Sequence, residues 1–466
     1  MKTKYLITIL LILVTFNIRA QIVDIPDANF KNALVNYPVA ELGNEILEDV
    51  DTNNDGEIQL IEAQEVLHLF VSGFNINSLE GIEGFNSLSW LICGDNNLTT
   101  LDVTQNVLLE KLSIGSNQIQ SIDVSQNIFL QEIDCSQNQL TSLDFSLNPE
   151  LLYVQALDNF LTNIDVTQNP NLETLLCATN HLISIDVSNN PNLTLFQIYN
   201  NLLTSLDITQ NLNLEILRCG DNPLQELDVT QNQILETLSC YQNQLTSLNL
   251  TNNPNLLNLS CSQNLLTSLN LTQNINLVIL NCDNNNLTSL DLSQNIDLGN
   301  LYCNNNALLS LDLSLNQSLF TLDCSSNNLI ELDVKNGNNT FLNNLDATEN
   351  SNLNCIQVDD VNEANNELNW FKDVNVVYSE DCNLGIEDNT INEYTLYPNP
   401  ARDVMYLYNV SLYDISSIKI YDALGRILLV QNNPSNQIDI SNLSTGLLII
   451  KIETDNGSFV KKVIKE

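Results

Sequence analysis

The chain has 466 residues, enough for two or three ordinary domains or for one long repeat array with attachments. Its 57 acidic and 15 basic residues give a net charge of −42, which argues against nucleic-acid backbones and anionic membrane surfaces as partners. Apolar residues make up 43% of the chain, so an extended core can form. The two histidines, His68 and His181, leave little scope for general acid–base catalysis.

The N-terminus has the pattern of a secretory signal peptide over residues 1–20. Two lysines precede an apolar run from Tyr5 to Phe16, and Ala20 is a small residue at a suitable cleavage point. The apolar run is shorter than a typical membrane span, and no other run reaches about 18 apolar residues. We therefore expect an exported protein whose mature chain has no transmembrane segment and in which disulfides can form.

A motif in the N-terminal cap, assigned to residues 21–65, predicts calcium binding. The twelve residues that begin at Asp51 match an EF-hand loop, with Gly56 at its sharp turn. The expected oxygen ligands are Asp51, Asn53, Asp55, Glu57 (through its carbonyl) and Glu62. Helices are expected at Asp27–Tyr37 or Glu45–Val50 before the loop and at Leu60–Leu67 after it. The alternative is an Asp- and Asn-rich cap turn that holds no ion.

A 21-residue pattern follows and predicts a solenoid over residues 66–354. It starts twelve times without an insertion, from Leu88 to Leu319. Counted from each start as offset 0, offsets 0, 3, 10, 13 and 15 are always Leu, Ile, Val or Phe, so we expect them to face inward. The two-residue spacings at offsets 3 and 5 and at offsets 13 and 15 predict short strands on both sides of the coil, each paired in parallel with the next turn.

Other columns of the repeat have structural interpretations. Asn fills all twelve copies of offset 8 and eleven of offset 18, where an inward amide can satisfy the backbone of a turn. Nine cysteines occupy offset 5, but Ile114, Ala156 and Ile198 share that column, so we interpret it as apolar packing of free thiols. Offset 14 is Asp in ten copies and Asn in two, and it points outward. This column is a solvated face or, as an alternative, a loose site for divalent cations.

With its Leu-Asp-Val-Ser-x-Asn second half, the repeat resembles the leucine-rich-repeat family and its internalin-like bacterial subgroup. The resemblance covers about Val66 to Leu353. It implies a mainly β solenoid with a concave face lined by offsets 2, 4, 6 and 7, most of which are small and polar. The exceptions include the predicted binding residues, although scattered surface apolar residues need no function: Trp90, Tyr153, Tyr199, Arg218, Tyr241 and Tyr302.

Three segments follow the array. Residues 355–383 are the expected C-terminal cap, closed by a disulfide between Cys355 and Cys382, and residues 384–393 are a polar linker. Residues 394–466 hold strand-like blocks that closely resemble the type A C-terminal sorting domain of the type IX secretion system: Tyr397–Asp403, Ile418–Arg426, Gly446–Ile452 and Lys461–Lys465. The resemblance implies a small β-sandwich, recognition by the secretion machinery, and a secreted or outer-surface location in a Gram-negative bacterium. An unrelated structural β-domain is the alternative.

The sequence contains no Gly-rich phosphate loop, paired-His zinc motif or nucleophile elbow, so we do not expect an enzyme. Function must then come from a surface. We predict an interaction protein that binds an extracellular protein partner through its concave face. A carbohydrate- or matrix-binding surface protein is the alternative.

Overall fold

The computed structural model describes residues 21–43, 46–382, 395–408, 415–422, 426–432, 437–454 and 457–466. The chain divides after Glu380 into two compact units. The expected signal peptide and all of the expected linker lie outside the described residues.

The N-terminal cap places two short helices and a hairpin at the start of the coil. Helix α1 (Ala28–Asn36) begins after Asp27, whose carboxylate accepts hydrogen bonds from the N–H groups of Asn29 and Phe30. Strands β1 (Ala40–Glu41) and β2 (Leu47–Glu48) pair antiparallel, and β1 covers the first edge of the large sheet. Helix α2 (Leu60–Glu65) follows the predicted calcium loop. Of the two helices expected before that loop, the one at Asp27–Tyr37 is α1, whereas the Glu45–Val50 segment contains β2, because its backbone pairs with β1.

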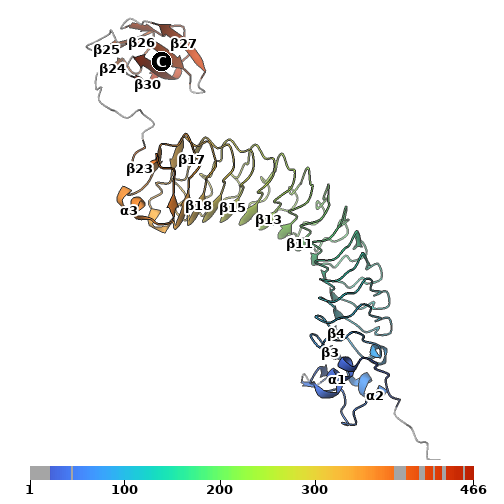
Figure 1. Ribbon diagram of the computed structural model, residues 1–466. Helices are drawn as coiled ribbons and strands as arrows, with labels where there is room; N and C mark the ends of the chain where they lie inside the picture. The colour runs from blue at the N-terminus through green and yellow to red at the C-terminus, as the bar shows by residue number, and fades with distance from the viewer. Residues whose placement is uncertain are drawn as a thin grey trace, which may run out of the picture. The chain divides into compact units, whose positions relative to one another are not determined.

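One side of each turn is a short strand at offsets 2–4, and fifteen such strands line the inside of the curved solenoid (Figure 1). They pair in parallel and in register, so equivalent residues of neighbouring repeats lie side by side. With β1 and β2 they make a 17-stranded sheet. In order, they are β3 (His68–Phe70), β4 (Trp90–Ile92), β5 (Lys111–Ser113), β6 (Glu132–Asp134), β8 (Tyr153–Gln155), β10 (Thr174–Leu176), β11 (Leu195–Gln197), β12 (Ile216–Arg218), β13 (Thr237–Ser239), β14 (Asn258–Ser260), β15 (Ile279–Asn281), β16 (Asn300–Tyr302), β18 (Thr321–Asp323), β20 (Asn344–Asp346) and β22 (Trp370–Phe371).

The opposite side of the coil has strands at only some turns. They form one pair and one four-stranded sheet: β7 (Ser142–Asp144) with β9 (Asn163–Asp165), and β17 (Ser310–Asp312), β19 (Glu331–Asp333), β21 (Cys355–Gln357) and β23 (Val377–Ser379). At the other turns, offsets 13 and 15 are still inward, but their backbones do not pair. The inner strands keep the usual spacing of about 4.8 Å, so the turns are farther apart on the outside of the curve (Figure 1).

The two Asn columns stabilise the turns in different ways. At offset 8, Asn222 donates to the carbonyls of Ile198, Cys219 and Gly220 and accepts from the N–H of Leu203. The residue before each offset-8 Asn has a left-handed backbone, with φ of 51–56° in all twelve repeats. At offset 18, each Asn amide donates to carbonyls of the previous turn, but the Oδ1 of all eleven copies has no hydrogen-bond partner among the described residues.

The cysteine column is packed inside the coil. All nine of its cysteines are free and fully buried, and burial raises their thiol pKa, to about 12 for Cys93 and Cys219. The remaining two cysteines, Cys355 and Cys382, are disulfide-bonded. Their cap continues the coil for one more turn, because β22 pairs with β20 and β23 pairs with β21. It also contains the short helix α3 (Val361–Asn366).

The second unit contains two antiparallel sheets that share one core. The sheets are β24 (Thr395–Tyr397), β25 (Val404–Tyr408) and β28 (Gln437–Asp439), and β26 (Ile415–Tyr421), β27 (Ile427–Asn432), β29 (Gly446–Thr454) and β30 (Gly457–Lys465). Met405 and Ile438 from the first sheet are buried with Ile418 and Ile450 from the second. This is the predicted β-sandwich arrangement.

Candidate functional site

The residues that depart from the repeat pattern gather near the middle of the concave sheet. Arg218 and Ile216 are two residues apart on β12, so their side chains point to the same side of the sheet. Leu195 on β11 is the register partner of Ile216. Tyr199 and Tyr241 follow β11 and β13 at offset 6. We call these five residues the central concave cluster: Leu195, Tyr199, Ile216, Arg218 and Tyr241.

A glycine allows the aromatic part of this cluster to pack closely. Gly220 lies at offset 6 between the two tyrosines, and a Cβ there would be 2.4 Å from Cε1 of Tyr241. The ring of Tyr241 therefore lies against the Gly220 backbone, in the space that any other residue would occupy. Partial burial raises the pKa of Tyr241, as do the nearby Asp221 carboxylate and Tyr199 phenol. The sequence did not identify Gly220, although it interrupts a column that holds larger residues in the neighbouring repeats.

Trp90 belongs to a second group at the N-terminal end of the sheet. The His68 ring stacks on it with 4.2 Å between the ring centroids, and the His68 Nδ1 lies 2.7 Å from the Glu41 carboxylate. Lys111 lies 5.5 Å from the Trp90 ring centroid and 2.5 Å from the Glu132 carboxylate. No partner for His68 was evident from the sequence. These five side chains form one continuous row of mutual contacts.

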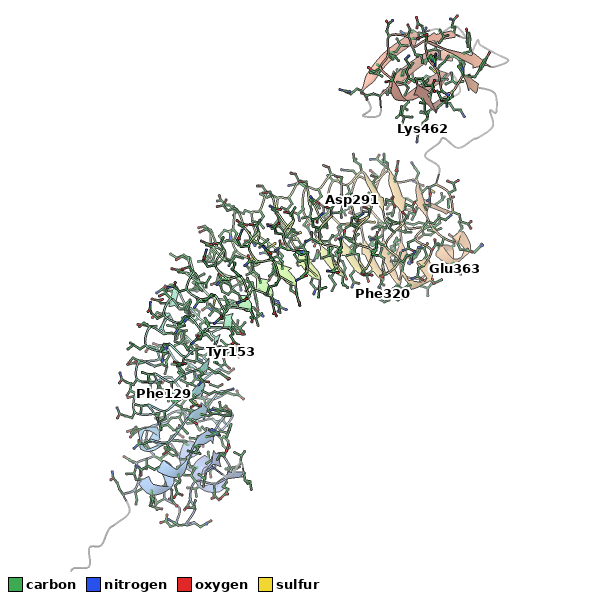
Figure 2. All side chains as sticks on the ribbon, turned by 180° about the vertical axis from the view of Figure 1, so that it is seen from behind. Phe129, Tyr153, Asp291, Phe320, Glu363 and Lys462 are labelled. Atoms are coloured by element: carbon green, nitrogen blue, oxygen red, sulfur yellow. The ribbon has the colours of Figure 1, made fainter. Side chains whose placement is uncertain are left out.

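The remaining two predicted residues lie apart from these groups. Tyr153 is on the inside of the curve (Figure 2) and donates its hydroxyl proton to Gln155 on the same strand. Tyr302 is exposed on β16, four strands from Arg218. The structure therefore brings together three of the six predicted concave residues, Tyr199, Arg218 and Tyr241.

The predicted calcium loop is closed by its own hydrogen bonds. The buried Asp51 carboxylate accepts from the N–H groups of Asp55 and Gly56 at 3.0 and 2.8 Å. The buried Glu62 carboxylate accepts from Thr52, Asn53 and Gln59.

Two further contacts involve side chains of this loop. The amide of Gln59 donates to both carboxylate oxygens of Asp55, and the Glu57 side chain pairs with Lys31 at 2.6 Å. Over the described part of the chain, no three Asp, Glu, His or Cys side chains are close enough together to hold a metal ion. A bound ion would thus have to displace the Gln59 amide from Asp55.

The carboxylates of the outward Asp column accept hydrogen bonds from their own turns. In most copies the carboxylate accepts a hydrogen bond from the N–H two residues later, as Asp207 does from Thr209 at 2.9 Å, and from the hydroxyl of the same residue at 2.7 Å. These bonds lower the pKa of seven members of the column: Asp102, Asp123, Asp144, Asp186, Asp207, Asp228 and Asp291. Asn249 makes the same contacts with Thr251, so the column has a structural role without a bound cation.

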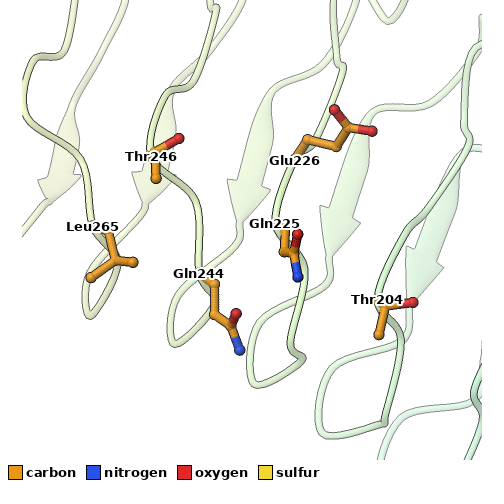
Figure 3. A pocket seen from close by; sticks show the side chains of 6 residues that line it. All are labelled: Thr204, Gln225, Glu226, Gln244, Thr246 and Leu265. Carbon is orange, nitrogen blue, oxygen red and sulfur yellow. The ribbon is translucent and has the colours of Figure 1, made fainter.

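A hollow of about 540 Å³ lies beside the concave sheet, between neighbouring turns (Figure 3). It is lined by Thr204, Gln225, Glu226, Gln244, Thr246 and Leu265. These residues come from equivalent positions of adjacent repeats, at offsets 9, 11 and 12. No charged pair converges there, and none of the predicted site residues lines it.

Comparisons with known proteins agree with this architecture. Residues 395–466 match the family described as a secretion system C-terminal sorting domain, which implies secretion or the cell surface. No curated protein sequence matches the chain. None of the described helices is long and apolar enough to cross a membrane.

Two solved structures from Listeria monocytogenes are similar to the chain. One is the functional domain of InlJ, which includes a cysteine ladder, with 25% identity, a TM-score of 0.65 and coverage of 96% of this chain and 98% of that one. The other is an internalin (inlF), with 20% identity, a TM-score of 0.56 and coverage of 71% and 95%. The chain therefore combines an internalin-like leucine-rich-repeat solenoid with a secretion system C-terminal sorting domain.

Proposed function

We propose that the protein acts at the surface of a Gram-negative bacterium, or after release from it, by binding a protein partner through the central concave cluster. One observation carries this proposal: the repeat keeps its structural columns almost unchanged, while its bulky departures meet at Tyr199, Arg218 and Tyr241 around Gly220. Aromatic and Arg side chains beside aliphatic ones are the composition of interface hot spots. The sorting domain supports the extracellular location.

A carbohydrate ligand is the second candidate, because exposed aromatic rings can stack on sugars. The structure favours it less at Trp90, whose ring is already stacked by His68 and approached by Lys111. In the central concave cluster, the aliphatic Leu195 and Ile216 lie beside the aromatic residues. Aliphatic side chains suit apolar groups of a protein better than sugar hydroxyls.

Binding tests can separate these candidates. The mature chain would be immobilised and exposed to surface proteins of host or neighbouring cells, and in parallel to a glycan array. We expect a protein partner whose retention falls at least about tenfold with Tyr199→Ala or Tyr241→Ala. The matched control is Leu309→Ala, which removes an exposed side chain outside the concave strands. Equal retention by all variants would overturn the proposal, and glycan binding lost with Tyr199→Ala would favour the second candidate.

We also propose that the loop from Asp51 to Glu62 binds one Ca²⁺ ion as a structural cofactor of the cap. Its support is the set of oxygen donors at EF-hand positions, two of them buried carboxylates. Calcium should raise the unfolding temperature of the mature chain relative to a chelator, and Asp51→Ala should abolish that rise. Glu57→Ala is the control, because only the backbone carbonyl of that residue is an expected ligand. A flat calorimetric titration of the wild-type chain would reject this site.

A further inference from the structure

Positive charge is scarce in the solenoid and its caps. Residues 21–383 contain 47 acidic and five basic residues. Four of the five side-chain cations have partners in the structure. Their contacts are Lys31 with Glu57 at 2.6 Å, Lys111 with Glu132 at 2.5 Å, Lys335 with the Glu380 carbonyl at 2.8 Å, and Lys372 with the Val376 carbonyl at 2.6 Å.

The fifth cation, Arg218, has no such partner. It is exposed, and the described residues give its guanidinium neither a hydrogen bond nor an ion pair. Its register partners, Gln197 and Ser239, are uncharged. Acidic residues outnumber basic ones by nearly ten to one in this part of the chain. Arg218 nonetheless has no ion-pair partner among the described residues, although it lies in the middle of the concave face.

The neighbours of Arg218 define what else a ligand must carry. Leu195 and Ile216 form a partly exposed aliphatic pair on the adjacent row of the sheet. Tyr241, which rests on Gly220, and Tyr199 lie at offset 6, two positions beyond the offset of Arg218 along the repeat. A ligand that fits all of these contacts has one carboxylate next to an apolar group.

We propose that Arg218 binds an Asp or Glu side chain of the protein partner, and that the adjacent residue of the partner is apolar and packs on Leu195 and Ile216. The planar guanidinium matches a carboxylate with two parallel hydrogen bonds. This inference rests on the proposed function and specifies the partner's contact segment. The acidic solenoid repels a partner of high negative charge, so the rest of the contact segment is neutral or basic.

The same charges disfavour an acidic polysaccharide. A uronate or sialate chain repeats its carboxylates along the strand, whereas the concave sheet offers one unpaired cation near its centre. The lysine of the concave strands, Lys111, already pairs with Glu132, and the other charged residues at the strand position of Arg218 are carboxylates, such as Asp134 and Asp323. A single acidic side chain would be attracted by Arg218 and repelled by few of the carboxylates.

A phage-displayed library of random dodecapeptides, selected on the mature full chain, tests this assignment. The expected peptides carry one Asp or Glu beside Leu, Ile, Val or an aromatic residue. Arg218→Gln should weaken their binding about 10- to 100-fold, and replacing the peptide's acidic residue by its amide should do the same without a further loss in the Arg218→Gln chain. Lys335→Gln is the matched control, since it removes one positive charge away from the concave strands and should leave binding unchanged.

The other outcomes are distinguishable. Selected peptides could contain no acidic residue, bind the Arg218→Gln chain unchanged and lose binding with Tyr199→Ala. That result would overturn the proposed carboxylate contact and leave the proposed function standing. Peptides that bind all variants alike, or no enrichment at all, would count against both. Binding of sialylated or uronate glycans on an array, lost with Arg218→Gln, would overturn the peptide assignment.

Discussion

Replacing Asn by Ala should lower the free energy of unfolding more at offset 8 than at offset 18, although the residue type is the same in both columns. Asn222→Ala removes the acceptor of the buried Leu203 N–H, which lies 3.0 Å from the Asn222 Oδ1. An orphaned buried N–H costs about 1–3 kcal/mol. The three carbonyls that Asn222 serves each keep another donor, at 3.1, 3.2 and 3.0 Å, so their loss adds little. We expect a total of about 2–3 kcal/mol.

Asn211→Ala should cost less. It removes two donor bonds of 2.9 Å to the carbonyls of Val187 and Asn190, and both carbonyls keep a backbone N–H donor at 3.1 and 3.2 Å. It also removes a buried Oδ1 that has no partner among the described residues, which offsets part of the loss. We expect about 1 kcal/mol or less.

Urea unfolding of the two variants, followed by circular dichroism, measures this difference as a shift of the midpoint. Hydrogen exchange adds a local readout, because Leu203 should lose protection in the Asn222→Ala chain alone. Both sites lose the same side-chain volume, so each variant is the control for the other. A midpoint shift for Asn211→Ala equal to or larger than that for Asn222→Ala would refute the reasoning.

Three further predictions concern titration and the cysteines. Hydrogen bonds lower the pKa of Asp207 in the folded chain, so its carboxylate stabilises the turn at pH values above the unfolded pKa of about 3.9, and this stability is lost as pH falls through the folded pKa. The urea midpoint of wild type should therefore exceed that of Asp207→Asn by less at pH 2 than at pH 5. A constant difference between the two midpoints would contradict this. Cys219 and the other buried thiols should react with a thiol reagent at pH 8 only as fast as the chain unfolds, and fast reaction of the native chain would show that the column is open. Replacing Cys355 and Cys382 by Ser should destabilise the cap by about 3 kcal/mol, seen as a reductant-sensitive unfolding transition in wild type that the variant lacks; a transition insensitive to reductant would argue against this role.

Periodicity made most of the fold predictable, because each column is sampled twelve times in one chain. The inward positions and the free cysteines follow from residue type and spacing, whereas the β-sandwich was implied by the resemblance to the sorting domain. Strand pairing on the outer side was less predictable, since it depends on curvature that no single repeat encodes. The alternative helix at Glu45–Val50 was wrong for a similar reason, because β2 gains its pairing only from β1.

The residues of the candidate site could be listed from the sequence, but their contacts could not. Tyr199, Arg218 and Tyr241 stand out because they break the small-polar pattern of their columns. That the Tyr241 ring lies on Gly220 depends on side-chain direction, and the sequence shows only a small residue there. The partners of His68 were hidden for a related reason, since Glu41 reaches it through an antiparallel pairing outside the repeat.

The central claim is that the central concave cluster forms a binding surface, and Gly220→Ala tests it most directly. This change leaves every proposed contact residue in place but fills the space under the Tyr241 ring, which must swing away. Gly299→Ala is the control, because a Cβ there would meet no atom nearer than 3.7 Å. We predict that Gly220→Ala lowers partner retention at least about fivefold with an unchanged unfolding midpoint, while Gly299→Ala retains the partner fully. Equal retention by the two variants would contradict the account.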